Sequence, residues 1–127
     1  MYVHSGIEAK LVRVPLNTAV VQGSAVTFEC SSNDISSKLP WFNSSCVTTI
    51  SLSDCREYFI NSGYNDNFPT RFTVTSLNNG THITRDLNIN PTQLTDAGVY
   101  LCAELLTVTG VSINDSTSSA QLIVLGK

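Results

Sequence analysis

Cysteine and histidine are the first residue types to consider for chemistry in this chain, because they form disulfides, bind metals and act as nucleophiles. The sequence contains four cysteines and two histidines. They are Cys30, Cys46, Cys55, Cys102, His4 and His82. The Cys-x-x-Cys or Cys/His spacing of a zinc site is absent. The even cysteine count therefore predicts two disulfides, and we expect neither a metal nor another cofactor.

Serine, aspartate and glutamate give little support for catalysis. The serines gather in polar stretches, without a histidine and an acid at a spacing that indicates a catalytic triad. The acidic residues are scattered, which is typical of solvated surface groups rather than of a paired acid and base. The sequence therefore predicts a protein that is not an enzyme.

The charge of the chain argues against nucleic acid as a partner. Its 127 residues include 7 basic and 10 acidic side chains, which gives a net charge of −3 and leaves no basic block. Phosphate backbones are bound through clustered Lys and Arg. Apolar runs long enough to span a bilayer are also absent. We expect this segment to contact neither nucleic acid nor the membrane directly.

Several features predict an extracellular location. Residues 1–5 lack the apolar core of an export signal, but disulfides persist mainly in oxidising compartments, so we expect a removed signal. Three Asn-x-Ser/Thr sequons begin at Asn43, Asn79 and Asn114, and each is a candidate glycosylation site. The chain ends abruptly at Gly126-Lys127, which favours a domain cut from the ectodomain of a larger membrane protein over a secreted protein.

Short apolar stretches separated by turn residues predict strands, and no convincing long helix is present. Pro15 interrupts the first strand and marks an edge or a switch between sheets. Asn79-Gly80 is a strong hairpin signal. The pattern is typical of a single sandwich or barrel domain over residues 1–127, with residues 1–6 as a flexible segment. The expected strands are 11–14, 20–21, 26–30, 39–42, 58–60, 71–75, a strand ending at 89, one containing 100–102, and 121–125.

One run of residues identifies the architecture more closely. Asp96 to Cys102 reads Asp-Ala-Gly-Val-Tyr-Leu-Cys, Cys30 ends a strand of alternating polarity, and Trp41 follows it. Cys, Trp and Tyr-x-Cys in this order and strand context resemble an immunoglobulin V-set domain. The resemblance covers nearly the whole chain. It implies an all-β fold, the immunoglobulin V-type two-sheet Greek-key sandwich.

The resemblance assigns roles to the cysteines. Cys30 and Cys102 would form the disulfide between the sheets, and Trp41 would pack against it. The remaining pair, Cys46 and Cys55, departs from the plain V-set pattern. In the lettering of V-set strands, the expected strands 39–42, 58–60, 71–75, the strand containing 100–102, and 121–125 are C, C′, D, F and G. We expect the Cys46–Cys55 pair to fix an extended segment between strands C and C′, either as a simple structural link or as part of a binding region.

The resemblance also assigns structural roles to three polar residues. Arg71 on strand D would bridge to Asp96 before strand F through a charge-assisted contact. Tyr100, two residues before the second Cys, occupies the tyrosine-corner position. All three are expected to hold the fold rather than to act on a ligand.

Two departures separate the chain from antigen receptors. Phe42-Asn43-Ser44-Ser45 follows Trp41, where antibody-like domains carry a Gln, and residues 116–119 replace their Phe-Gly-x-Gly bulge. Antibody-like pairing is therefore not expected. The resemblance then implies a germline-encoded immune-type, allorecognition or adhesion receptor, with invertebrate receptors included.

Function is predicted on the outer face of the C/F/G sheet. The alternation of strand F, together with residues of strands C and G, places an apolar stripe where a one-sided sheet should be polar. Its expected members are Phe42, Val99, Leu101, Ala103, Leu105, Ile123 and Leu125. Exposed apolar patches usually mark protein interfaces. The alternative is that neighbouring domains or the extended C–C′ loop cover the stripe.

The F–G segment, residues 104–117, is unusually apolar for a loop and includes Val108. Either it is a protruding hairpin that turns near Gly110 and touches a partner, or the strand containing 100–102 and the strand 121–125 (strands F and G) continue as a longer ladder. We expect an extracellular recognition or adhesion module that binds a protein, with a second copy of itself among the candidates. The alternatives are a secreted innate-immune module that binds microbial carbohydrate and a structural spacer. The aromatic residues that could stack on sugars are Tyr58, Phe59, Tyr64 and Phe68.

Overall fold

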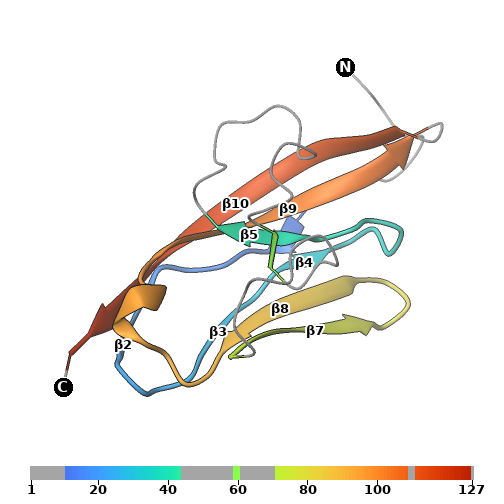
Figure 1. Ribbon diagram of the computed structural model, residues 1–127. Helices are drawn as coiled ribbons and strands as arrows, with labels where there is room; N and C mark the ends of the chain where they lie inside the picture. Colours follow the sequence, from blue (N-terminus) through green and yellow to red (C-terminus); the bar gives the residue numbers. More distant parts are fainter. Residues whose placement is uncertain (1–10, 44–58, 61–70, 109–110, 127) are drawn as a thin grey trace.

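The computed structural model describes residues 11–43, 59–60, 71–108 and 111–126, which form two sheets packed face to face (Figure 1). The predicted all-β sandwich is confirmed. The helical element of the described residues is the 3-10 turn η3 (Leu94–Asp96). In the part of the chain that the structure describes, no helix has the length and apolar character to cross a membrane. The predicted Cys46–Cys55 pair and residues 1–6 lie outside the described residues.

The first sheet follows the path β1-β4-β8-β3, and β7 pairs with β8. Its strands are β1 (Leu11–Arg13), β3 (Val26–Phe28), β4 (Ser31–Ser32), β7 (Phe72–Asn78) and β8 (Ile83–Ile89). β3 lies within the strand expected over residues 26–30, whereas β4, which also pairs with β8, lies beyond the predicted end of that strand.

The second sheet has the order β2-β10-β9-β5-β6. Its strands are β2 (Thr18–Val21), β5 (Trp41–Asn43), β6 (Phe59–Ile60), β9 (Gly98–Val108) and β10 (Val111–Leu125). The β2–β10 pair is parallel and the other pairs are antiparallel. The strand expected around Phe59 is present as β6, paired with β5.

Pro15 lies where the chain leaves the first sheet for the second. Proline has no N–H to donate to a ladder, so it ends strand pairing at this position. β1 pairs with β4 before Pro15, and β2 pairs with β10 after it. The predicted switch between sheets is confirmed.

The core lies between the sheets and is made of alternate residues on facing strands. Phe28 contributes the central ring, with its centroid 6.4 Å from that of Trp41 and 5.8 Å from that of Tyr100. Cys30 and Cys102 form the predicted disulfide beside these rings. The buried core residues are Val26, Phe28, Cys30, Leu39, Trp41, Ile60, Phe72, Leu87, Ile89, Tyr100, Cys102, Ala120 and Leu122.

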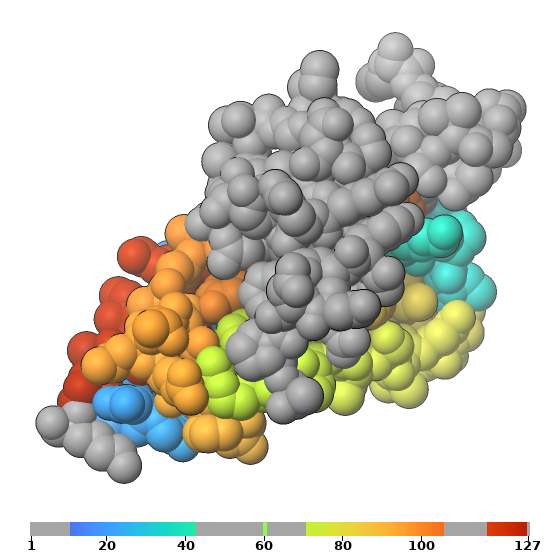
Figure 2. Space-filling model, viewed as in Figure 1, coloured from blue at the N-terminus to red at the C-terminus, as the bar shows by residue number. Residues whose placement is uncertain are grey.

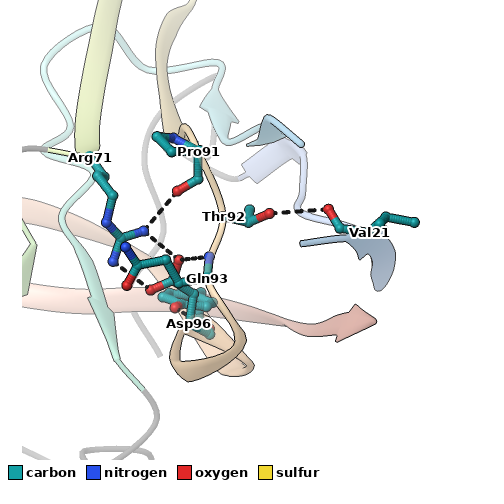
Figure 3. Close-up of polar contacts among 7 residues, drawn as sticks. Val21, Arg71, Pro91, Thr92, Gln93 and Asp96 are labelled. Carbon is teal, nitrogen blue, oxygen red and sulfur yellow. Dashed lines mark hydrogen bonds and ion pairs between the residues drawn. The ribbon is translucent and has the colours of Figure 1, made fainter. Parts of the chain in front are cut away.

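The predicted Arg71–Asp96 bridge is present and bidentate (Figure 3). Arg71 Nη1 lies 2.6 Å from Asp96 Oδ2, and Nη2 lies 3.0 Å from Oδ1. Asp96 Oδ2 also accepts a bond from the backbone N–H of Gln93 at 2.8 Å. The side-chain hydrogen bonding between Arg71 and Asp96 raises the pKa of the Arg71 guanidinium. The bridge thereby joins the start of β7 to the turn before β9.

The tyrosine corner is also confirmed. The Tyr100 hydroxyl donates to the backbone carbonyl of Asp96 at 2.5 Å. Asp96 therefore binds Arg71 with its side chain and Tyr100 with its main chain. The segment between β8 and β9 is held from both sides.

The predicted hairpin joins β7 to β8, but its turn is displaced by one residue. The backbone N–H of Asn79 donates to the carbonyl of His82 at 3.1 Å, so the central residues are Gly80 and Thr81. Gly80 has φ of 93°, a conformation that favours glycine. The expected centre, Asn79-Gly80, was wrong, because Asn79 itself pairs with His82: its side-chain Oδ1 accepts the return bond from the His82 N–H at 2.8 Å.

Candidate functional site

The ladder of the second sheet brings the predicted stripe onto one face. Phe42 on β5 is directly opposite Leu101 on β9, and Val99 is opposite Gln121 on β10. Their neighbours in the sequence point into the core, as Trp41 does. The predicted residues therefore share the outer face, which we define as the side of the second sheet turned away from the core.

The centre of this face is buried, contrary to expectation. Phe42 is 1% exposed, Leu101 is 4% exposed and Ala103 is 0% exposed, and none of the three belongs to the core cluster between the sheets. The prediction of an open apolar stripe is wrong for these three residues. Alternation along a strand determines which face a side chain occupies, whereas its exposure depends on what the rest of the chain places over that face.

The F–G segment is a continuous ladder. Strands β9 and β10 pair from Gly98 opposite Leu122 to Val108 opposite Val111, with a register shift between Asn114 and Ser116. Both predicted descriptions fit this ladder, since β9 and β10 continue as a long ladder and also form a hairpin whose last pair is Val108 and Val111, while contact with a partner stays a prediction. The side chain of Val108 lies outside the described part of the structure.

Val99 and Leu105, the two remaining β9 members of the stripe, are half-buried. Leu105 exchanges two backbone hydrogen bonds with Lys38, at 2.8 and 3.0 Å. These bonds attach β9 at Leu105 to the segment that precedes β5.

Exposed apolar side chains gather instead at the β2 end of the outer face. Ile123 is 46% exposed and Leu125 is 50% exposed. Val21 on β2 is opposite Leu125 in the parallel ladder and is 45% exposed. Val20 and Val124 pack against the core, so the alternating residues Val21, Ile123 and Leu125 face outward. We call these three residues the β2–β10 patch.

The paired stretches around the patch carry no charge. Residues 18–21 read Thr-Ala-Val-Val and residues 121–125 read Gln-Leu-Ile-Val-Leu. A contact made here would rest on apolar burial rather than on ion pairs. Sequence reasoning found Ile123 and Leu125 but missed Val21, although the inward position of Val20 gives the same alternation signal.

Glu104 is a second feature that sequence reasoning missed. This β9 residue is fully buried, and its Oε2 accepts hydrogen bonds from the hydroxyls of Ser32 and Ser37, the latter at 2.8 Å. Its position two residues after Cys102 is the signal that places it on the inward side of the strand. Glu104 thus ties β9 to the segment between β4 and β5.

Arg85 carries a buried polar side-chain atom that lacks a hydrogen-bond partner within the described ranges. Its Nε is buried and forms no hydrogen bond. Burial lowers the pKa of its guanidinium. Arg85 lies on β8 of the first sheet, away from the β2–β10 patch, and its backbone carbonyl accepts a bond from Trp41 Nε1 at 2.8 Å. The described residues also hold no cluster of metal ligands.

The sequence model of the immunoglobulin V-set domain matches residues 13–125. No curated protein matches the sequence. Among solved structures, the titin I9–I11 tandem is similar, with 17% identity, a TM-score of 0.62 and coverage of 94% of this chain. This chain spans 34% of that tandem's length.

Two further solved structures come from complexes. The RIG-5 IG1 homodimer has 17% identity and a TM-score of 0.62, and the match covers 93% of this chain and 98% of that chain. The complex of Dpr2 Ig1-Ig2 with DIP-Theta Ig1-Ig3 has 19% identity and a TM-score of 0.60, covering 92% of this chain and 32% of that chain. At these identities the likeness shows a common fold.

Proposed function

The chain belongs to the immunoglobulin V-set domain family, and from this premise we propose that it is an extracellular recognition or adhesion module that binds a protein partner through the outer face of its second sheet. We place it in the ectodomain of a larger receptor of the immune, allorecognition or adhesion type. A second copy of the chain is the first partner to test, because a two-fold interface needs only one self-complementary patch.

The observation that carries the proposal is the β2–β10 patch. Three neighbouring apolar side chains, Val21, Ile123 and Leu125, are each about half exposed on adjacent strands. Burying the exposed half of each would contribute on the order of 1 kcal/mol. The patch would therefore form the apolar centre of a larger contact. Half-buried Val99 lies next to the patch, on the neighbouring strand β9.

Two of the similar structures contain protein–protein contacts, which supports a protein partner. One is a homodimer of a single domain, and another is a complex between two proteins. The titin tandem has the same fold, so the fold alone does not separate an adhesion module from a structural spacer. The aromatic residues considered for carbohydrate stacking lie outside the described side chains, and the structure adds no support for a sugar site.

The test compares charged substitutions on the two sheets. Ile123→Asp should reduce self-association of the purified domain in sedimentation equilibrium by at least tenfold, because an unpaired charge would enter the contact. Leu77→Asp is the matched control, since Leu77 is also a strongly exposed apolar residue but lies on β7 of the first sheet. Leu101→Asp is unsuitable, because a charge at this buried position would unfold the domain.

A strictly monomeric wild-type domain would contradict the homophilic form of the proposal. Binding to other proteins is then measured with tetramers of the domain on cells of the source organism. Binding that Ile123→Asp abolishes and Leu77→Asp preserves supports a different protein partner. Binding that survives Ile123→Asp, or that disappears after glycosidase rather than protease treatment of the cells, would overturn the proposed face or the proposed class of partner.

A further inference from the structure

The sequon at Asn79 lies in an exposed turn of the first sheet. Asn78 opposite Ile83 is the last pair of the β7–β8 ladder, and residues 79–82 form the turn beyond it. Asn79 is exposed, and a Cβ added to Gly80, the middle residue of the sequon, would meet nothing within 4 Å. Figure 2 shows the yellow atoms of this hairpin at the rim of the molecule, next to the cyan atoms of the segment before β5. The turn has room for a large substituent.

The side chain of Asn79 is oriented by its own turn. Its Oδ1 accepts hydrogen bonds from the Thr81 N–H at 3.0 Å, the Thr81 hydroxyl at 3.0 Å and the His82 N–H at 2.8 Å. Its amide nitrogen, Nδ2, donates to none of the described residues. The oxygen is therefore held by the turn, while the nitrogen that would carry a glycan remains available.

The other two sequons differ in position. Asn43 lies on β5 opposite Tyr100, and Asn114 lies on β10 opposite Leu105, so both belong to backbone ladders of the second sheet. A glycan on either would be carried by the sheet that bears the proposed contact face. Asn79 belongs to the first sheet, on the opposite side of the core (Figure 1).

We infer that Asn79 is an N-glycosylation site and that its glycan shields the end of the β7–β8 hairpin while leaving the β2–β10 patch open. The inference rests on the proposed extracellular location. The donor would be a lipid-linked oligosaccharide pyrophosphate. A bond forms between Asn79 Nδ2 and C1 of the first sugar as the C1–O bond to the pyrophosphate breaks, Nδ2 gives up one proton, and the lipid pyrophosphate leaves.

The glycan would cover an exposed edge. β7 pairs with β8 on one side, and no other described strand pairs with its second edge. Leu77 on this strand is 65% exposed and lies two residues from Asn79, about 7 Å along the strand. Edge strands with exposed apolar residues invite pairing with other chains. A glycan at this position would block association through the first sheet and favour contacts through the second.

The test expresses the chain behind an export signal from another secreted protein in a eukaryotic cell. The purified protein is treated with peptide-N-glycosidase in heavy-oxygen water, and the peptide containing Asn79 is analysed by mass spectrometry. We expect the labelled aspartate that replaces a glycosylated asparagine. Thr81→Ala should abolish the label because the sequon hydroxyl is lost, and Thr81→Ser, the matched control, should keep it. An unmodified Asn79 in secreted, disulfide-bonded protein would overturn the inference.

Hydroxyl-radical footprinting tests the shielding. Removal of the glycan should increase labelling of Leu77 and leave labelling of Ile123 and Leu125 unchanged. Equal labelling of Leu77 in both forms, or a change at Ile123, would contradict the assigned position of the glycan. Because the export signal is foreign and no partner is required, this outcome is independent of the Ile123→Asp binding experiment.

Discussion

Tyr100 joins the core to the turn that precedes β9. Its ring stacks on Phe28 at 5.8 Å and lies 6.2 Å from the ring of Phe72. Its hydroxyl donates to the Asp96 carbonyl. Burial, together with the nearby charge of Asp96, raises the pKa of Tyr100 well above its ordinary value, although Arg71 partly opposes the shift. The folded state thus keeps the phenol protonated.

The raised pKa of Tyr100 predicts a loss of stability in alkali. The unfolded chain loses this proton near pH 10, before the folded chain does, so the stabilisation is fully present below about pH 10 and declines above it. Urea unfolding should show the free energy of unfolding falling by up to roughly 1 kcal/mol per pH unit. Tyr100→Phe should be less stable by about 1 kcal/mol at neutral pH and should lose that slope. The same slope in both proteins would contradict the assignment.

At the scale of elements, Glu104 fixes how one end of β9 meets the segment before β5. Ser32 lies in β4 and Ser37 in the following segment, and both hydroxyls bond to the same carboxylate oxygen. Ser32 Oγ also accepts a bond from the Asp34 N–H at 3.1 Å. The buried carboxylate and these hydroxyls therefore form one connected polar network at this end of the sandwich.

We predict that Glu104→Ala lowers the free energy of unfolding by about 2 kcal/mol, because two buried hydroxyls lose the acceptor that they share. Hydrogen exchange should accelerate at the Ser37 N–H, which bonds to the Asp34 carbonyl in the native segment. Ser37→Ala, which removes one bond of the network, should cost less. Equal exchange at Ser37 in Glu104→Ala and wild-type protein would show that the segment does not depend on this tether.

The strands of the second sheet show what alternation predicts and what it does not. The predicted face of the sheet was correct for Phe42, Leu101 and Ile123. Exposure was correct for Ile123 and wrong for Phe42 and Leu101. The side-chain period of two is a local property of an extended backbone, whereas solvent access depends on contacts that the strand itself does not encode.

At the scale of the whole molecule, the Cys30–Cys102 disulfide connects the two sheets through a sequence separation of 72 residues. A loop of this length corresponds to about 4 kcal/mol in the chain-entropy treatment. Domain stabilities are typically about 5–15 kcal/mol, so the disulfide supplies a large fraction of the total.

Replacing both residues of this pair, Cys30→Ala with Cys102→Ala, should therefore abolish cooperative unfolding or lower its free energy by about 4 kcal/mol, as followed by circular dichroism in denaturant. The control replaces Cys46 and Cys55, whose predicted loop is much shorter and should cost less. A soluble Cys30→Ala/Cys102→Ala protein with wild-type stability would contradict the entropic argument.

The sequence by itself determined the architecture and the disulfide and ion pair that stabilise it. The order of Cys30, Trp41, Tyr100 and Cys102 resembles the V-set pattern, and that resemblance implied the sandwich, the disulfide and the Arg71–Asp96 bridge, all of which the structure contains. Each depends on chemistry that is specific to the residue type, such as sulfur pairing or a bidentate ion pair.

Only the tertiary structure decided which parts of the outer face are open. It buried Phe42, Leu101 and Ala103 and left Val21, Ile123 and Leu125 exposed, and it placed the Glu104 carboxylate against two serines far away in the sequence. Apolar residues look alike in a sequence whether they are covered or free, because burial is a property of the assembled surface rather than of a residue type. The order of residue types along the chain was therefore enough to identify the fold, whereas it did not determine the contact surface.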